Sequence, residues 1–110
     1  MNMTIEQAKR ILEILAKDEK LEKFSSHVFI DKYIEKFESE YIDLLVEEKE
    51  KQKQASKNPT DIFRKVHSQI AIFLSDKQDK LGIRHIDDVT DMNIHYRETA
   101  CAEWRFESSK

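Results

Sequence analysis

The sequence is poor in the residues that shape loops and cross-links. It contains one glycine, one proline and one cysteine in 110 residues. A loop-rich or sandwich fold needs turn residues at every reversal of the chain, so such folds are excluded. One cysteine can form neither an internal disulfide nor a cysteine-based zinc site. One glycine also rules out a phosphate loop, a nucleophile elbow and a dinucleotide-binding fingerprint. These absences favour a mainly helical protein.

Long apolar runs are also absent. No stretch approaches the roughly 18 apolar residues of a membrane-spanning helix, and the start, MNMTIEQAKRILEIL, lacks the pattern of a secretory signal. The formal net charge of −3 argues against non-specific coating of nucleic acid or membranes. The single cysteine fits a reducing compartment. We therefore expect a soluble, cytoplasmic protein with no membrane partner.

Amphipathic patterns predict a mainly α fold in one domain, residues 1–110. Apolar residues recur three and four positions apart along three stretches, as on one face of a helix. The predicted class is a three-helix core with a small C-terminal β-hairpin or ordered arm over 84–110. The three helices are expected at about 4–23, 26–54 and 59–81.

Local signals support these boundaries. Thr4 and Gln7 match a capping box at the start of the first helix. Ser25 or Ser26 is the expected cap of the second. Residues 47–58 have helix-forming side chains without an apolar face, which predicts a polar helical extension or a linker.

The third helix has signals at both ends. Asn58 is placed to cap it, and Pro59 suits the first helical position. Gly82, the single glycine, follows the last apolar residues, where a left-handed C-terminal cap is expected.

The C-terminal tail changes its period. Ala100, Ala102, Trp104 and Phe106 alternate with polar residues, which is typical of a half-buried strand. The pattern predicts a hairpin with strands at 92–96 and 100–106, closing at 97–99. A short helix over 99–107 is the alternative.

The expected core combines the apolar faces of the three helices. Trp104 and Phe106 are expected to cover one end of it. The helical members are Leu12, Leu15, Ile34, Phe37, Tyr41, Phe63, Val66, Ile70, Phe73 and Leu74.

Charge is unevenly distributed along the chain. Residues 31–50 contain eight acids and three bases, a net charge of −5, whereas 51–69 contain five bases and one acid, a net charge of +4. Such a dipolar chain can pair with itself across a two-fold axis. A solvated surface with clustered signs is the plainer interpretation, because exposed ion pairs contribute little.

The second helix supplies the first candidate site, a protein interface. Tyr33, Phe37, Tyr41 and Leu44 follow three-four spacing, as at the seam of a short coiled coil. Tyrosines are enriched where a buried surface keeps one wet edge. The alternative is that this stripe belongs to the chain's own core.

The third helix supplies an alternative site, for nucleic acid. Three helices followed by a hairpin resemble the general layout of a winged-helix DNA reader, in which this helix would enter the groove. Side chains of types that contact phosphates or base edges lie on or beside it. They are Lys57, Arg64, Lys65, Ser68, Gln69 and Arg84.

A third cluster lies in the segment 84–95. His85, Asp87, Asp88, Asp91 and His95 are residue types that bind transition metals. Their spacing matches neither a calcium loop nor a zinc motif. An acidic turn explains them better, and we predict no metal or other cofactor.

No catalytic residue is predicted. Cys101 and four histidines meet the minimum inventory for a thiol nucleophile with a base, but no local signature surrounds Cys101. The sequence therefore favours a non-enzymatic protein-interaction or regulatory module of adaptor or inhibitor type. Its expected partner is another protein, with a homodimer favoured, and DNA is the alternative.

Overall fold

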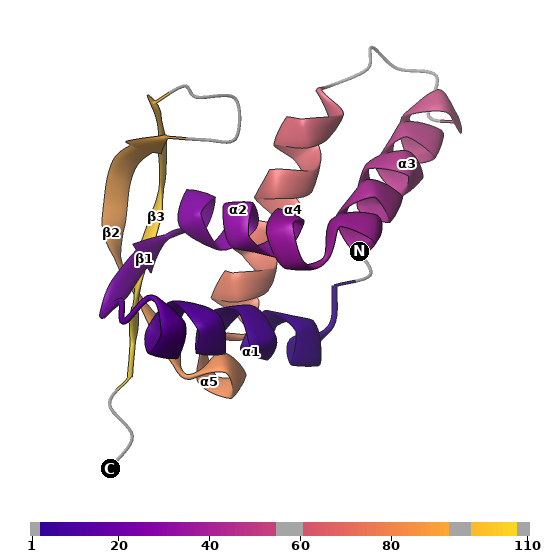
Figure 1. Ribbon diagram of the computed structural model, residues 1–110. Helices are drawn as coiled ribbons and strands as arrows, with labels where there is room; N and C mark the ends of the chain where they lie inside the picture. The colour runs from indigo at the N-terminus through magenta and orange to yellow at the C-terminus, as the bar shows by residue number, and fades with distance from the viewer. Residues whose placement is uncertain (1–2, 55–60, 93–97, 108–110) are drawn as a thin grey trace.

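The computed structural model describes residues 3–54, 61–92 and 98–107, without the side chains of 91, 92, 98 and 99. Helices form most of this part of the chain and a three-stranded antiparallel sheet completes it (Figure 1). The elements are α1 (Ile5–Glu13), the π-helix η1 (Ile14–Asp18), β1 (Lys23–Ser25), α2 (Ser26–Lys36), α3 (Glu38–Gln54), α4 (Ile62–Asp76), α5 (Gln78–Leu81), β2 (Ile83–Met92) and β3 (Glu98–Phe106).

The first helix starts as predicted and ends earlier. Thr4 Oγ1 accepts from the Gln7 backbone N–H, and Gln7 Oε1 accepts from that of Thr4, both at 3.1 Å, which confirms the capping box. The prediction that the helix runs to residue 23 is wrong. Its last turn widens into η1, which buries both Ile14 and Leu15, and the chain then reverses at Lys20, whose φ is +55°.

The segment after this reversal forms β1, a strand that the sequence did not predict. β1 pairs with β3 at the far end of the chain, and Phe24 lies opposite Trp104. A strand of three residues has no periodicity of its own, so this pairing decides its conformation. Ser25 ends the strand and caps α2, because its Oγ accepts from the Val28 N–H at 3.2 Å.

The predicted second helix is two helices. α2 and α3 meet at Phe37, whose φ of −130° and ψ of 49° break the helical path. The expectation of one helix over 26–54 is therefore wrong at this residue. The break lets α2 pack against α1 and β3 while α3 turns to lie against α4 (Figure 1). α3 then continues through the polar residues to Gln54.

The predicted third helix is shorter and also divided. α4 begins at Ile62, three residues later than predicted, and Asp61 caps it by accepting from the Phe63 N–H at 2.9 Å. Asn58 and Pro59, the expected start, lie outside the described residues. α4 ends at Asp76, α5 follows after Lys77, and Gly82 closes α5 in the left-handed region at φ +69°, as predicted.

The C-terminal hairpin exists with different strands. β3 agrees with the predicted strand at 100–106, and the helix considered for 99–107 is wrong. The first strand is β2, at 83–92 rather than 92–96, and residues 98 and 99 belong to β3 rather than to the turn. The aspartates of this segment favoured the prediction of a loop. Pairing with β3 along the segment overrides their low strand propensity. Residues 93–97 lie outside the description.

The sheet has the order β1-β3-β2 and flanks the helices at one side (Figure 1). One core cluster joins it to α1, α2, α3 and α4. Seven of the predicted core residues are buried: Leu12, Leu15, Tyr41, Val66, Ile70, Leu74 and Trp104. Five are only partly buried against the cluster: Ile34, Phe37, Phe63, Phe73 and Phe106. Phe24, Phe29, Ile30, Tyr33, Leu81 and Ile83 complete the apolar centre, together with Met3, Ala8, Ile11, Ile14 and Leu44.

Candidate protein-interaction surface

The four residues predicted as a protein interface lie within the chain's own fold. Tyr33, Tyr41 and Leu44 are buried, and Phe37 is partly buried with its ring stacked on Tyr33 at a centroid distance of 5.5 Å. Their three-four spacing therefore serves α2 and α3 packing inside the monomer. In this arrangement Tyr33, Tyr41 and Leu44 are covered by the fold, and Phe37 is partly exposed.

Polar contacts between α3 and α4 fix which face of α3 points inward. Tyr41 Oη lies 2.6 Å from His67 Nε2. About two turns further along α3, Glu48 is only 6% exposed, and its carboxylate accepts from Gln69 Nε2 at 3.1 Å and from Gln52 Nε2 at 3.3 Å. These hydrogen bonds satisfy polar groups that would be costly to bury unpaired. They hold α3 with the opposite face outward.

That outward face carries two apolar residues in solvent. Ile42 is 48% exposed and Val46 is 54% exposed. They are four residues apart, so their side chains lie next to each other on the helix. β-branched residues lose side-chain freedom in a helix, and these two make no contribution to the buried core. The described part of the chain leaves about half of each side chain in solvent.

Charged residues extend this apolar pair along the helix. Glu38 is exposed in the first turn of α3, and Lys49 and Lys53 are exposed towards its end. We call the face formed by Glu38, Ile42, Val46, Lys49 and Lys53 the outer face of α3. This face was not predicted from the sequence, because the longer apolar stripe on the inner face dominates the pattern. The available signal was the pair of apolar residues lying off that stripe.

The described part of the chain exposes two further large apolar residues, each on a different element. Ile72 on α4 is 58% exposed, and Ile86 on β2 is 44% exposed. The register between β2 and β3 shifts between His85 and Asp87, so Ile86 sits at a bulge. Single exposed apolar residues are common on protein surfaces. The outer face of α3 is thus the place where the described helices expose two such residues on adjacent turns.

The described residues among those predicted to contact nucleic acid lie on two elements, α4 and β2. Arg64, Lys65 and Ser68 are exposed together on α4. Gln69 is partly buried and engaged by Glu48. The last described member of the set, Arg84, lies on β2.

Arg84 already has partners in the fold. Its Nη1 lies 2.8 Å from Asp79 Oδ1, and its Nε contacts the Glu107 carboxylate. The nearby Glu107 and Asp79 charges raise its pKa, with Glu107 contributing most. Lys57 lies outside the described residues. The structure therefore leaves three of the six predicted residues exposed side by side.

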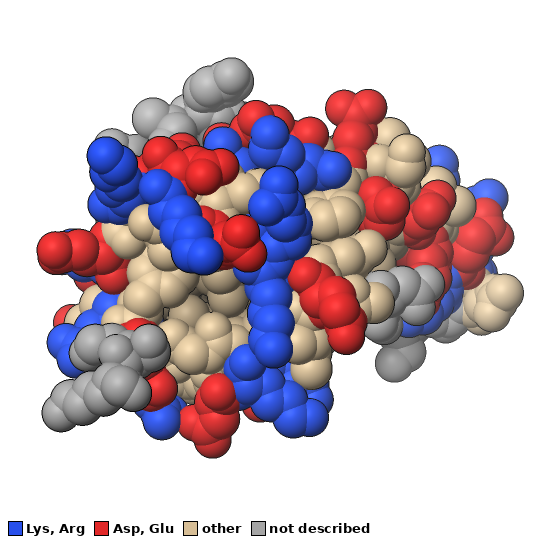
Figure 2. Space-filling model, turned by 60° about the horizontal axis from the view of Figure 1, so that its bottom comes forward, with Lys and Arg blue, Asp and Glu red and all other residues tan. Residues whose placement is uncertain are grey.

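The sheet has a mixed charge on its outer side. Lys23, Arg105 and Arg84 lie opposite one another on β1, β3 and β2. Lys23 Nζ is 3.8 Å from Glu103 Oε1, so acids compensate this row. Basic side chains also run between acidic ones over the side where α1 and α5 lie (Figure 2). Interspersed signs of this kind do not create the broad positive field that non-specific binding to nucleic acid requires.

The His/Asp segment is largely extended along β2. His85 Nε2 lies 3.4 Å from Asp88 Oδ1. The rings of His85 and Trp104 are in a T-shaped arrangement with their centroids 5.3 Å apart. Asp87 is in register with Glu103, on the other face of the strand from His85. No three His, Cys, Asp or Glu side chains among the described residues gather closely enough to hold a metal. His95 and the side chain of Asp91 lie outside the description.

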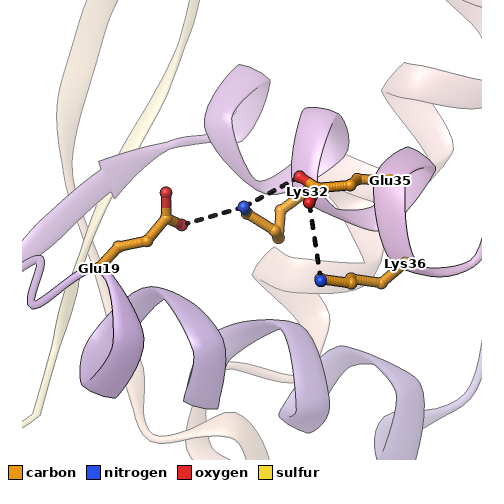
Figure 3. Close-up of polar contacts among 4 residues, drawn as sticks. All are labelled: Glu19, Lys32, Glu35 and Lys36. Atoms are coloured by element: carbon orange, nitrogen blue, oxygen red, sulfur yellow. Dashed lines mark hydrogen bonds and ion pairs between the residues drawn. The ribbon is translucent and has the colours of Figure 1, made fainter.

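Another charged cluster joins η1 to α2. Lys32 Nζ lies 3.0 Å from Glu35 Oε2 and 3.6 Å from Glu19 Oε2, and Lys36 lies 3.6 Å from Glu35 Oε1 (Figure 3). The hydrogen bond from Lys32 lowers the pKa of Glu35, and the same contact raises the pKa of Lys32. All four residues are engaged with one another, so the cluster links the end of the first helix to the second.

Two tyrosines inside the helical layer titrate abnormally. Burial, with a smaller effect of the Glu40 carboxylate, raises the pKa of Tyr33 to about 12. Burial and Asp61 raise that of Tyr41 to about 12. The Tyr33 hydroxyl is buried and has no hydrogen-bond partner among the described residues. Both groups are therefore held in the neutral form.

Known proteins provide no further guide to this surface. No protein-family model, curated protein or solved structure matches the chain. None of the described helices is both long and apolar enough to span a bilayer. The geometry and chemistry of the described surface are therefore the basis for proposing a function.

Proposed function

We propose that this protein is a non-enzymatic interaction module of adaptor or inhibitor type that associates with a second copy of itself through the outer face of α3. The observation that carries the proposal is the exposure of Ile42 and Val46 on adjacent turns of one helix. Exposed apolar residues that touch each other mark protein contacts more often than scattered ones do. The buried contacts of Tyr41 and Glu48 present this face to solvent in a fixed orientation.

Sedimentation equilibrium of the purified chain over a range of concentrations tests the proposal. We expect a reversible dimer with a dissociation constant in the micromolar range, because one helix face is a small interface. Ile42→Glu and Val46→Glu should each weaken the dimer roughly tenfold or more, since an unpaired charge would be buried.

Ile72→Glu provides the matched control. It makes the same chemical change at a residue of similar exposure on α4 and should leave the dimer unchanged. Circular dichroism verifies that all three variants fold. A monomeric wild-type protein at about 100 µM, well above a micromolar dissociation constant, would contradict the proposal, as would equal effects of Ile42→Glu and Ile72→Glu.

A second candidate function is DNA binding through α4. It is favoured by Arg64, Lys65 and Ser68, which are exposed on one side of a helix that precedes a β-hairpin. Arg64 and Lys65 form no ion pair within the described part of the chain. The exposed Asp87 and Asp88 on that hairpin weigh against it, because they repel phosphates.

The same centrifugation with a mixed-sequence DNA duplex distinguishes the two functions. A DNA reader would co-sediment with the duplex at low salt and lose affinity steeply as salt rises. Arg64→Ala with Lys65→Ala would weaken that binding, whereas Ile42→Glu would not. A dimer that ignores DNA supports the interaction module.

A further inference from the structure

The charge of the outer face of α3 changes sign from one end of the helix to the other. Its five residues follow one another at spacings of four, four, three and four, which keeps them on one side of the helix. Glu38 stands at the N-terminal end, Ile42 and Val46 occupy the middle, and Lys49 and Lys53 lie towards the C-terminal end. The face therefore has an acid at one end, an apolar centre and bases at the other end.

We propose that two copies of this chain pair through antiparallel α3 helices, with Glu38 of each copy beside Lys53 of the other; this arrangement rests on the proposed self-association. A two-fold axis near Val46 places the apolar centres of both helices together. Ile42 then faces the partner's Lys49, whose aliphatic stem can cover it while the ammonium group stays in water. Both ends of the pair bring opposite charges together.

A parallel arrangement of the same two helices is less favourable than the antiparallel one. Parallel helices would place Glu38 beside Glu38 and Lys53 beside Lys53, and like charges in register repel. The charges of the outer face thus favour the antiparallel direction.

The charged ends are available for this contact. The side chains of Lys53 and Glu50 are 65% and 59% exposed, and their ion pair within the helix is long, at 3.8 Å. Glu38 forms no ion pair among the described residues. An exposed pair within one helix is weak, so it does not prevent Lys53 from reaching a partner.

Charge reversal tests the arrangement. Glu38→Lys alone and Lys53→Glu alone each place like charges at both ends of the dimer, and each should weaken self-association roughly tenfold. An equimolar mixture of the two variants should associate as a heterodimer with about wild-type affinity, because both ends are again complementary. Sedimentation of one fluorescently labelled variant with the other measures this directly.

Matched controls keep the test specific. Glu40→Lys is the control for Glu38→Lys, because it reverses an acidic charge in the same turn of α3 but off the outer face. Lys51→Glu is the control for Lys53→Glu, because it reverses a basic charge two residues away, also off the outer face. Neither should change self-association, and their mixture should show no preference for the heterodimer. Circular dichroism of each variant verifies that α3 still forms.

The outcomes separate the two levels of the proposal. A wild-type dimer that is weakened by Ile42→Glu but unaffected by either reversal, or not restored in the mixture, overturns the antiparallel arrangement alone. A wild-type protein that stays monomeric overturns the proposed function and the arrangement together. Weakening by each reversal with restoration in the mixture supports both.

Discussion

Trp104 shows how one residue connects the two ends of the chain. It is 2% exposed and lies opposite Phe24 of β1, and its Nε1 donates to Ser26 Oγ at 2.9 Å. Its ring therefore packs a C-terminal strand against the start of α2. The alternation in the tail predicts this burial, whereas the Ser26 partner, 78 residues away, carries no sequence signal.

Replacing Trp104 should be among the most costly changes in the core. Trp104→Ala should lower the free energy of unfolding by about 3–5 kcal/mol, because it leaves a large cavity. Ser26→Ala should cost about 1–3 kcal/mol, since it leaves the indole N–H buried without an acceptor. Urea denaturation measures both. A loss of less than about 1 kcal/mol in Trp104→Ala would remove β3 from the core.

At the scale of elements, the sequence signals at helix ends were reliable where the partner is local. The capping box of Thr4 and Gln7 closes over three residues, and Gly82 ends α5 in the left-handed conformation with its N–H donating to the Gln78 carbonyl, four residues back. The break at Phe37 has no such signal. No glycine or proline marks it, and the apolar stripe continues across it, so only the need of α3 to reach α4 explains it.

Gly82 allows a clean test of backbone strain. A Cβ at this position would meet nothing within 4 Å, so the positive φ is the only obstacle to a side chain. Gly82→Ala should lower the free energy of unfolding by about 1–2 kcal/mol. Gly82→Asn should cost less, because asparagine tolerates this conformation. Thermal or urea unfolding provides the comparison, and an alanine variant as stable as the wild type would contradict the argument.

At the scale of the whole molecule, Tyr33 and Tyr41 limit stability in alkali. Both have a pKa of about 12 in the folded protein, above the usual value near 10. The unfolded chain therefore loses these protons first, and deprotonation favours unfolding. Stability should be unaffected by these groups below pH 10 and should fall as the pH rises from about 10 to 12.

Substitutions separate the two tyrosines. Tyr33→Phe removes a hydroxyl that has no partner in the described part of the chain, so it should cost less than about 1 kcal/mol at pH 7 and should reduce the alkaline loss. Tyr41→Phe removes the contact with His67 and should cost about 1–2 kcal/mol at pH 7. Urea denaturation at pH 7 and pH 11 measures both effects. An unchanged pH dependence in Tyr33→Phe would contradict the assignment.

In the whole molecule, the apolar residues that are buried and those that are exposed differ from what the sequence pattern predicted. The regular stripe of Tyr33, Tyr41 and Leu44 is buried within the monomer. The irregular pair of Ile42 and Val46 remains outside and forms the candidate surface. A helical pattern shows which residues share a face, but it does not show whether the face meets the chain itself or another molecule.

The sequence alone determined the helical class, the capping of the first helix, the left-handed turn at Gly82 and the strand that buries Trp104. Each of these depends on spacing or backbone preference within a few residues. Tertiary structure decided the rest: β1, the extent of β2, the break at Phe37 and the direction in which α3 faces. These features depend on contacts between segments far apart in the chain, such as Phe24 with Trp104 and Glu48 with Gln69. Their free energy comes from burial and pairing that no local pattern encodes.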